Sequence, residues 1–178
     1  MNFIMRRPTI KVHGHAPKWV KEADNTWILR FDGEMDYIAL PMESLPRGAF
    51  TLEMELRPAA DKPMVLFRTQ GVYQINSFSL LTRNGTLCAG WYDETGKVRT
   101  FQTGLALKVG EWNQVSVRYD LSKLTISCNG QEESFPLSSR QLIYSACCFG
   151  GHDDPFGIPS GKPGYFQGDL RKIRIVQR

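Results

Sequence analysis

The chain has 178 residues, of which 42 % are hydrophobic and 22 % are charged, and its formal net charge is +4. These values suit one globular domain with its own core, and they exclude a disordered or collagen-like chain. No apolar run approaches the ~20 residues of a membrane helix, and no apolar stretch of a signal peptide follows Arg6 and Arg7. The basic residues are scattered, so we expect no nucleic-acid partner and no membrane partner.

Residues 1–26 are weakly patterned, and we interpret them as a lead-in with one edge strand near residues 9–12. His13 and His15 alternate in this segment without an acidic neighbour, so no zinc site is predicted there. Residues 27–178 form the predicted domain, because regular alternation begins at residue 27.

A period of two dominates the predicted domain. In the segment 50–57, Phe50, Leu52, Met54 and Leu56 alternate with polar residues, which is typical of an antiparallel strand with one dry face and one wet face. Further predicted strands are 27–31, 37–40, 64–68, 77–82, 87–92, 99–103, 113–120, 123–128, 131–135, 146–149 and 170–176. Many short strands at this spacing indicate a sandwich or a barrel, and the only helical feature expected is a short turn at 138–143.

Two Asn-Gly pairs, Asn84-Gly85 and Asn129-Gly130, predict tight hairpins, because both residue types tolerate a positive φ. The last strand predicts an irregularity. Leu170 has the opposite parity to Ile173 and Ile175, and a strand cannot bury all three without one extra residue. We therefore predict a β-bulge near residues 171–172, which would also re-aim the side chain of Asp169.

The chain contains four cysteines. Cys88, Cys128, Cys147 and Cys148 form no C-x-x-C metal pattern, so we expect small buried side chains. A disulfide between Cys88 and Cys128 is an open alternative, although no spacing argues for it.

The Gly- and Pro-rich segment 150–164 is too often interrupted by Gly and Pro to form a strand, and a loop of this length is usually functional or disordered.

Five motifs occur in a fixed order: F-D-G-E-M-D-Y-I at 31–38, F-T-L-E at 50–53, G-E-W-N-Q-V at 110–115, N-G at 129–130 and Y-F-Q-G-D-L at 165–170. Together they resemble bacterial laminin-G-like domains of the concanavalin A-like lectin and glucanase superfamily. The resemblance covers about residues 27–178. It implies an all-β fold, a concanavalin A-like jelly-roll sandwich of two antiparallel sheets, and an extracellular or periplasmic location. Where many members carry an acidic pair after the last motif, this chain has Arg171 and Lys172.

The resemblance also implies a structural calcium ion that bridges the first and last strands. Asp32, Asp36 and Asp169 fall in the matching regions, and Asp24 is a reserve ligand. Calcium requires several oxygen ligands, which carboxylates supply. The alternative is that these residues are turn-forming aspartates, which bond their own backbone.

A glycan site needs convergent polar groups beside apolar or aromatic walls. Trp91 shares the parity of Leu87 and is expected in the core, which leaves its neighbour Tyr92 as the better platform. The candidate ligand-binding residues are Tyr92, Asp93, Tyr73, Tyr165 and the cluster His152, Asp153 and Asp154.

A glycoside hydrolase of this fold would need two carboxyl groups ~5–5.5 Å apart for retaining chemistry. Glu53 and Glu55 share a strand face, but Arg57 stands where that signature has its third acidic residue. No Gly-x-Ser-x-Gly or phosphate-binding motif occurs either. The sequence thus predicts a non-catalytic carbohydrate-binding, lectin-like module, an accessory domain of a secreted bacterial-type protein, with a glycan or polysaccharide as partner. The alternatives are a protein-interaction or structural module of the same fold and, second, a glycoside hydrolase.

Overall fold

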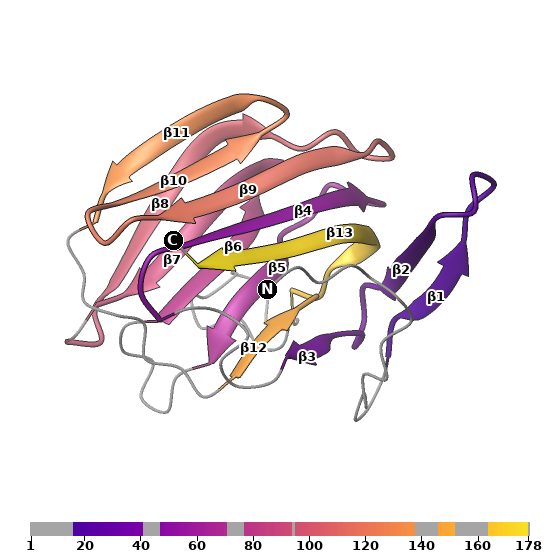
Figure 1. Cartoon of the computed structure of the whole chain (residues 1–178), viewed down its shortest axis with the longest axis horizontal. Coiled ribbons are helices and arrows are strands. Elements are labelled where there is room, and N and C mark those ends of the chain that lie inside the picture. Colours follow the sequence, from indigo (N-terminus) through magenta and orange to yellow (C-terminus); the bar gives the residue numbers. More distant parts are fainter. Residues whose placement is uncertain are drawn as a thin grey trace.

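The computed structural model describes residues 16–40, 47–70, 77–93, 95–137, 146–151 and 164–177, and these form thirteen strands in two antiparallel sheets (Figure 1). The seven-stranded sheet has the order β1 (Lys18–Lys21), β2 (Trp27–Asp32), β13 (Gln167–Gln177), β4 (Phe50–Pro58), β9 (Asn113–Tyr119), β10 (Lys123–Cys128) and β11 (Gln131–Pro136). The six-stranded sheet has the order β3 (Ile38–Leu40), β12 (Ala146–Phe149), β5 (Met64–Gln70), β6 (Ser77–Arg83), β7 (Thr86–Tyr92) and β8 (Val98–Ala106). The predicted all-β jelly-roll sandwich is confirmed.

Every predicted strand from residue 27 onwards overlaps an observed strand. The sheet also contains β1, a strand that the sequence did not predict; it pairs with β2 inside the segment interpreted as a lead-in. Positive φ at Asn25 closes this hairpin. The strand predicted near 9–12, the turn at 138–143 and most of the loop 150–164 lie outside the described residues. Within the described part of the chain, no helix is long and apolar enough to cross a membrane.

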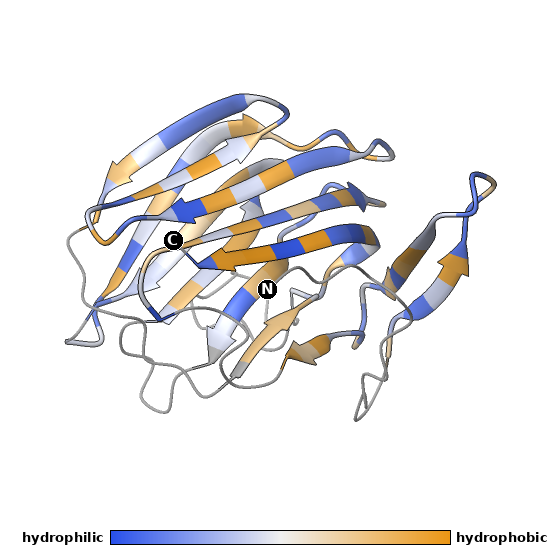
Figure 2. Ribbon diagram, viewed as in Figure 1, coloured by the Kyte–Doolittle hydropathy of each residue, from blue (hydrophilic) through white to orange (hydrophobic). Residues whose placement is uncertain are grey.

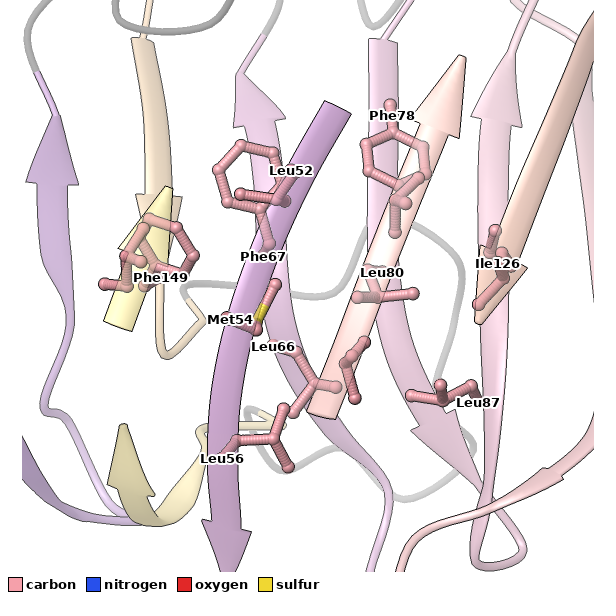
Figure 3. Packing of buried hydrophobic residues seen from close by; sticks show 14 of the residues in the cluster. Leu52, Met54, Leu56, Leu66, Phe67, Phe78, Leu80, Leu87, Ile126 and Phe149 are labelled. Carbon is pink, nitrogen blue, oxygen red and sulfur yellow. The ribbon is translucent and has the colours of Figure 1, made fainter. Parts of the chain in front are cut away.

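The core lies between the two sheets and follows the predicted alternation, which Figure 2 shows as alternating orange and blue along β13, β4 and β9. Figure 3 shows Leu52 of β4 beside Phe67 of β5, and Leu56 of β4 at the other end of the cluster, nearer Leu66 of β5. Trp91 is 0 % exposed, as predicted, and contributes to an aromatic cluster with Phe78 and Tyr119. Burial of such large side chains between the layers supplies most of the cohesion of a sandwich.

In the middle of the six-stranded sheet, the outward face is also buried. Along β6 and β7, the residues that alternate with the core set are closed to solvent. They include Ser79, Leu81, Cys88 and Tyr92. The expectation of one dry and one wet face is therefore wrong for β6 and β7, whereas the edge strand β8 alternates between exposed and buried residues toward its end.

All four cysteines are buried and free, so Cys88 and Cys128 form no disulfide.

The hairpin and bulge predictions are confirmed. Asn84 and Gly85 have φ of 51° and 74°, and Asn129 and Gly130 have φ of 51° and 84°. In the β13–β4 pairing the register shifts between Arg171 and Arg174, and Lys172 is the extra residue, with φ of 52°. The bulge lets Leu170, Ile173 and Ile175 all face the core.

Candidate functional site

A pocket of ≈ 650 Å³ lies where β13 begins, beside the end of β2. It is lined by Ala16, Lys18, Arg30, Phe31, Asp32, Asp36, Ala59, Gln167, Gly168 and Asp169. We call it the rim pocket. The three aspartates that the sequence predicted as metal ligands all line it, so the structure brings them to one place.

Asp32 and Asp36 shape the turn that forms one wall of the rim pocket. The Asp32 carboxylate Oδ1 accepts hydrogen bonds from the backbone N–H groups of Glu34 at 2.8 Å, Met35 at 3.2 Å and Asp36 at 3.2 Å. The Asp36 Oδ2 accepts in return from the backbone N–H of Asp32 at 2.9 Å. Gly33 adopts φ of 80° inside this turn. These contacts match the alternative interpretation, in which the aspartates bond their own backbone.

Asp169 is held by two arginines from the neighbouring strands. Its register partners are Arg30 on β2 and Arg57 on β4, directly opposite on either side. Arg30 donates through Nε to Oδ1 at 2.8 Å and through Nη2 to Oδ2 at 3.3 Å. Arg57 donates to Oδ2 through Nε at 3.0 Å and through Nη2 at 2.6 Å. We call this arrangement the arginine clamp.

The arginine clamp shifts the titration of its members. Burial raises the pKa of Asp169, but the hydrogen bonds from Arg30 and Arg57 outweigh burial, so the pKa lies below its ordinary value. Burial lowers the pKa of Arg57, and the hydrogen bonds to Asp169 and Glu22 more than reverse this effect. All members of the clamp are therefore charged at neutral pH.

The arginine clamp continues along the outward face of the seven-stranded sheet. Arg57 donates to Glu22 at 2.7 Å, and Arg171 donates to Glu55 at 2.7 Å and to Glu22 at 3.4 Å. The guanidinium carbons of Arg57 and Arg171 lie 4.6 and 3.9 Å from the ring centroid of Trp112. This cation–π packing fixes both arginines, so Arg57 meets Asp169 with little freedom.

The charges around the rim pocket do not fit a calcium site. Both oxygens of Asp169 are engaged by guanidinium groups. Among the described residues, no group of three or more His, Cys, Asp or Glu side chains could hold a metal ion. The reserve residue Asp24 caps its own turn by accepting from the backbone N–H of Thr26 at 2.9 Å. The residues that the resemblance assigned to calcium therefore act as turn and ion-pair residues here.

Two polar side chains of the rim pocket remain available to a ligand. Within the described part of the chain, the Lys18 ammonium and the Gln167 amide make no side-chain hydrogen bond, and both line the pocket. The sequence analysis missed Lys18, Gln167 and Arg30. Arg30 carried a signal, since it is the outward residue between Leu29 and Phe31 in an alternating strand.

The predicted ligand-binding residues lie elsewhere. Tyr92 is 6 % exposed and Tyr165 is 8 % exposed, so the expectation that either ring forms an exposed platform is wrong. Asp93 caps a turn: its Oδ1 accepts from the N–H and hydroxyl of Thr95 at 2.9 and 2.6 Å and from the N–H of Lys97 at 3.0 Å. The remaining candidates, Tyr73, His152, Asp153 and Asp154, lie outside the described residues.

The carboxylate pair on β4 lies in a second, shallower hollow of ≈ 480 Å³ on the outward face of the seven-stranded sheet. Glu55 accepts from Arg171 and, at 2.8 Å, from Lys172, while Glu53 faces Arg174 at 3.6 Å. Burial raises the pKa of Glu55, but the hydrogen bonds from Lys172 and Arg171 lower it below its ordinary value. A general acid needs the opposite shift, so Glu55 is not placed to be the general acid of a glycosidase.

Solved structures similar to this chain share the sandwich. Domains LG4-5 of the mouse laminin α1 chain match with a TM-score of 0.70 at 17 % identity, over 94 % of this chain and 45 % of that chain. Domain 4 of AbnA, a GH43 extracellular arabinanase from Geobacillus stearothermophilus, was solved with arabinotriose. It matches with a TM-score of 0.69 at 14 % identity, over 93 % of this chain and 77 % of that chain. The CBM40 of Ruminococcus gnavus IT-sialidase, bound to α2,3 sialyllactose, matches with a TM-score of 0.56 at 15 % identity, over 72 % of this chain and 75 % of that chain.

This chain thus spans less than half of the laminin chain that it matches. Likeness at these identities shows the fold alone. No curated protein matches this sequence. The family Laminin_G_3, described as the concanavalin A-like lectin/glucanases superfamily, matches residues 32–178, which is most of the chain. The predicted resemblance is therefore confirmed: this chain belongs to the Laminin_G_3 family of the concanavalin A-like lectin/glucanases superfamily.

Proposed function

We propose that this chain is a non-catalytic glycan-binding module whose ligand enters the rim pocket. The observation that carries the proposal is a hollow of ≈ 650 Å³ that is lined by Lys18, Gln167 and the Arg30 guanidinium. Among the residues that the structure describes, the side chains of Lys18 and Gln167 make no hydrogen bond with the protein. A sugar hydroxyl both donates and accepts hydrogen bonds. An ammonium donates, and an amide does both, so together they are suited to read hydroxyl groups.

The similar structures support this proposal. AbnA domain 4 was solved with arabinotriose, and the sialidase CBM40 with sialyllactose, so this sandwich holds glycans in more than one protein. The arabinanase is extracellular, and we propose the same location for this domain. The lowered pKa of Glu55 and its ion pairs with Arg171 and Lys172 argue against a general-acid role for this residue, because an ionised carboxylate cannot donate a proton.

A protein-interaction module of the same fold is the second candidate. It is favoured by the burial of Tyr92 and Tyr165, because a sugar-binding site commonly presents an aromatic face and these two rings do not. A protein partner would use the rim pocket as part of a wider polar surface. The two candidates differ in whether free oligosaccharides bind.

A glycan array with the purified domain tests the proposal, using a panel that contains arabino-oligosaccharides and sialyllactose. The wild type is compared with Lys18→Ala/Gln167→Ala, and with the control Lys123→Ala/Gln131→Ala, whose side chains are exposed on β10 and β11. We expect saturable binding that falls by about tenfold or more in the pocket variant, since each lost hydrogen bond costs about 1 kcal/mol. The control is expected to bind like the wild type.

Two outcomes would contradict the proposal. If no glycan of the panel binds, the lectin-like function is wrong and the interaction module is favoured. If a glycan binds equally to all three proteins, the module is a lectin but its site is not the rim pocket.

A further inference from the structure

We propose that the guanidinium groups of Arg30 and Arg57 take the place of a structural calcium ion at Asp169, so that this domain joins β13 to β2 and β4 without a metal. The resemblance to laminin-G-like domains implies a calcium ion that bridges the first and last strands. In this chain the arginine clamp joins the last strand, β13, to its two neighbours in the sheet. The inference concerns the build of the domain and does not depend on glycan binding.

The first argument is that guanidinium groups engage both oxygens of Asp169. Oδ1 accepts one hydrogen bond from Arg30, and Oδ2 accepts one from Arg30 and two from Arg57. Calcium requires 6–8 oxygen ligands at about 2.3–2.6 Å. A calcium ion at Asp169 would have to displace a guanidinium group and would then lie beside two positive charges.

The second argument is the position of the clamp in the sheet. Asp169 stands on β13 directly opposite Arg30 on β2 and Arg57 on β4. Its ion pairs therefore cross two strand junctions at the same level, which is the mechanical role that a bridging cation would have. Arg57 is further fixed by Glu22 at 2.7 Å and by the ring of Trp112. Arg57 is thus held by several groups, whereas Arg30 completes the clamp from the solvent side.

The third argument is charge balance at the rim pocket. The carboxylates of Asp32, Asp36 and Asp169 line the rim pocket together with Lys18 and Arg30, and Arg57 pairs with Asp169 from β4. The pocket therefore has no excess of negative charge to attract a divalent ion. In addition, Asp32 already accepts three backbone hydrogen bonds through Oδ1.

Thermal unfolding of the intact chain in calcium chloride and in EDTA tests the inference, with wild type and Asp169→Asn measured side by side. The readout is the difference in Tm between calcium and EDTA for each protein. We expect no difference for wild type, and the same value for Asp169→Asn. A rise of Tm in calcium for the wild type that disappears in Asp169→Asn would overturn the inference, because Asp169 would then be a calcium ligand.

A second measurement covers the case in which Asp169→Asn does not fold. Calcium chloride is titrated into the EDTA-treated wild type by calorimetry, with Arg30→Gln/Arg57→Gln titrated in parallel. We expect no heat of binding for the wild type. If calcium binds to the wild type but not to Asp32→Asn, the inference is overturned, because that difference would place the ion in the rim pocket.

Discussion

Replacing Asp169 by asparagine should destabilise this domain far more than removing any surface ion pair. The substitution keeps the shape of the side chain but removes the charge that two guanidinium groups face. The Asp169 side chain is 9 % exposed and that of Arg57 is 25 % exposed, so this pair is close to the buried limit, where breaking one partner costs about 3–5 kcal/mol. The Arg30 side chain is 51 % exposed, so its pair adds only the surface value of about 0–1 kcal/mol.

Because Arg57 is partly exposed, breaking its ion pair costs less than breaking a fully buried one. We expect Asp169→Asn to lower the free energy of unfolding by roughly 2–4 kcal/mol. For a domain of this size, that loss corresponds to a fall of about 4–15 °C in Tm. Thermal unfolding followed by far-UV circular dichroism at pH 7 measures it. The control is Glu53→Gln, whose pair with Arg174 is 3.6 Å long and about half exposed, and whose loss should cost less than about 0.5 kcal/mol. Equal Tm values for Asp169→Asn and Glu53→Gln would refute the reasoning.

Three further predictions follow from the same structure. The pKa of Asp169 is lower in the folded chain than in the unfolded chain. The stability that its ion pairs contribute is therefore present above the unfolded-state pKa of about 4 and is lost as the pH falls through the folded-state pKa. The difference in Tm between wild type and Asp169→Asn should accordingly disappear in acid. Gly168→Ala should cost roughly 2–4 kcal/mol in denaturant unfolding, since φ is 145° and a Cβ would lie 2.3 Å from a backbone oxygen, whereas Gly48→Ala meets no atom within 4 Å and should be near neutral. Burial raises the pKa of Cys147 to about 12 and of Cys148 to about 11, so a thiol reagent at pH 8 should label them only after unfolding; rapid labelling of the native chain would contradict this.

Local pattern predicts the fold because each strand is specified by its own residues. The parity change between Leu170 and Ile173 is sufficient to predict the bulge, since side chains alternate strictly along a strand. The Asn-Gly turns are equally local. The sequence did not predict β1, because its four residues, Lys18–Lys21, are too few to show a repeated alternation of apolar and polar side chains. They form a strand by pairing with β2.

The prediction of Tyr92 as an exposed platform was wrong for a physical reason. Alternation was interpreted as one dry face and one wet face, so the neighbour of a core residue such as Trp91 was placed in solvent. β6 and β7 are buried on both faces. A nearly continuous apolar run, as in Leu87 to Tyr92, is the sequence signal for that situation, because a strand buried on both sides has no reason to alternate.

The sequence predicted some residues of the rim pocket but not their partners. Asp169 was expected as a calcium ligand because of the family resemblance, and the structure places it in the rim pocket between two arginines. Its partners Arg30 and Arg57 are 139 and 112 residues away in the chain, so no spacing could reveal the ion pairs. Only the register of β2, β13 and β4 brings them together, and that register is a property of the whole sheet.

The outward face of the seven-stranded sheet shows why the departure from the family pattern at Arg171 and Lys172 matters. Where many members carry acidic residues, this chain carries two cations, and both bind Glu55 on the adjacent strand. This pairing keeps Glu55 ionised at neutral pH, since its pKa is lowered despite burial. A glycosidase needs one carboxyl group of its pair to be protonated and the other free to act. The two cations that pair Glu55 with β13 therefore keep this carboxyl group from donating a proton, which is the physical reason that Glu55 is unsuited to be the general acid of a glycosidase.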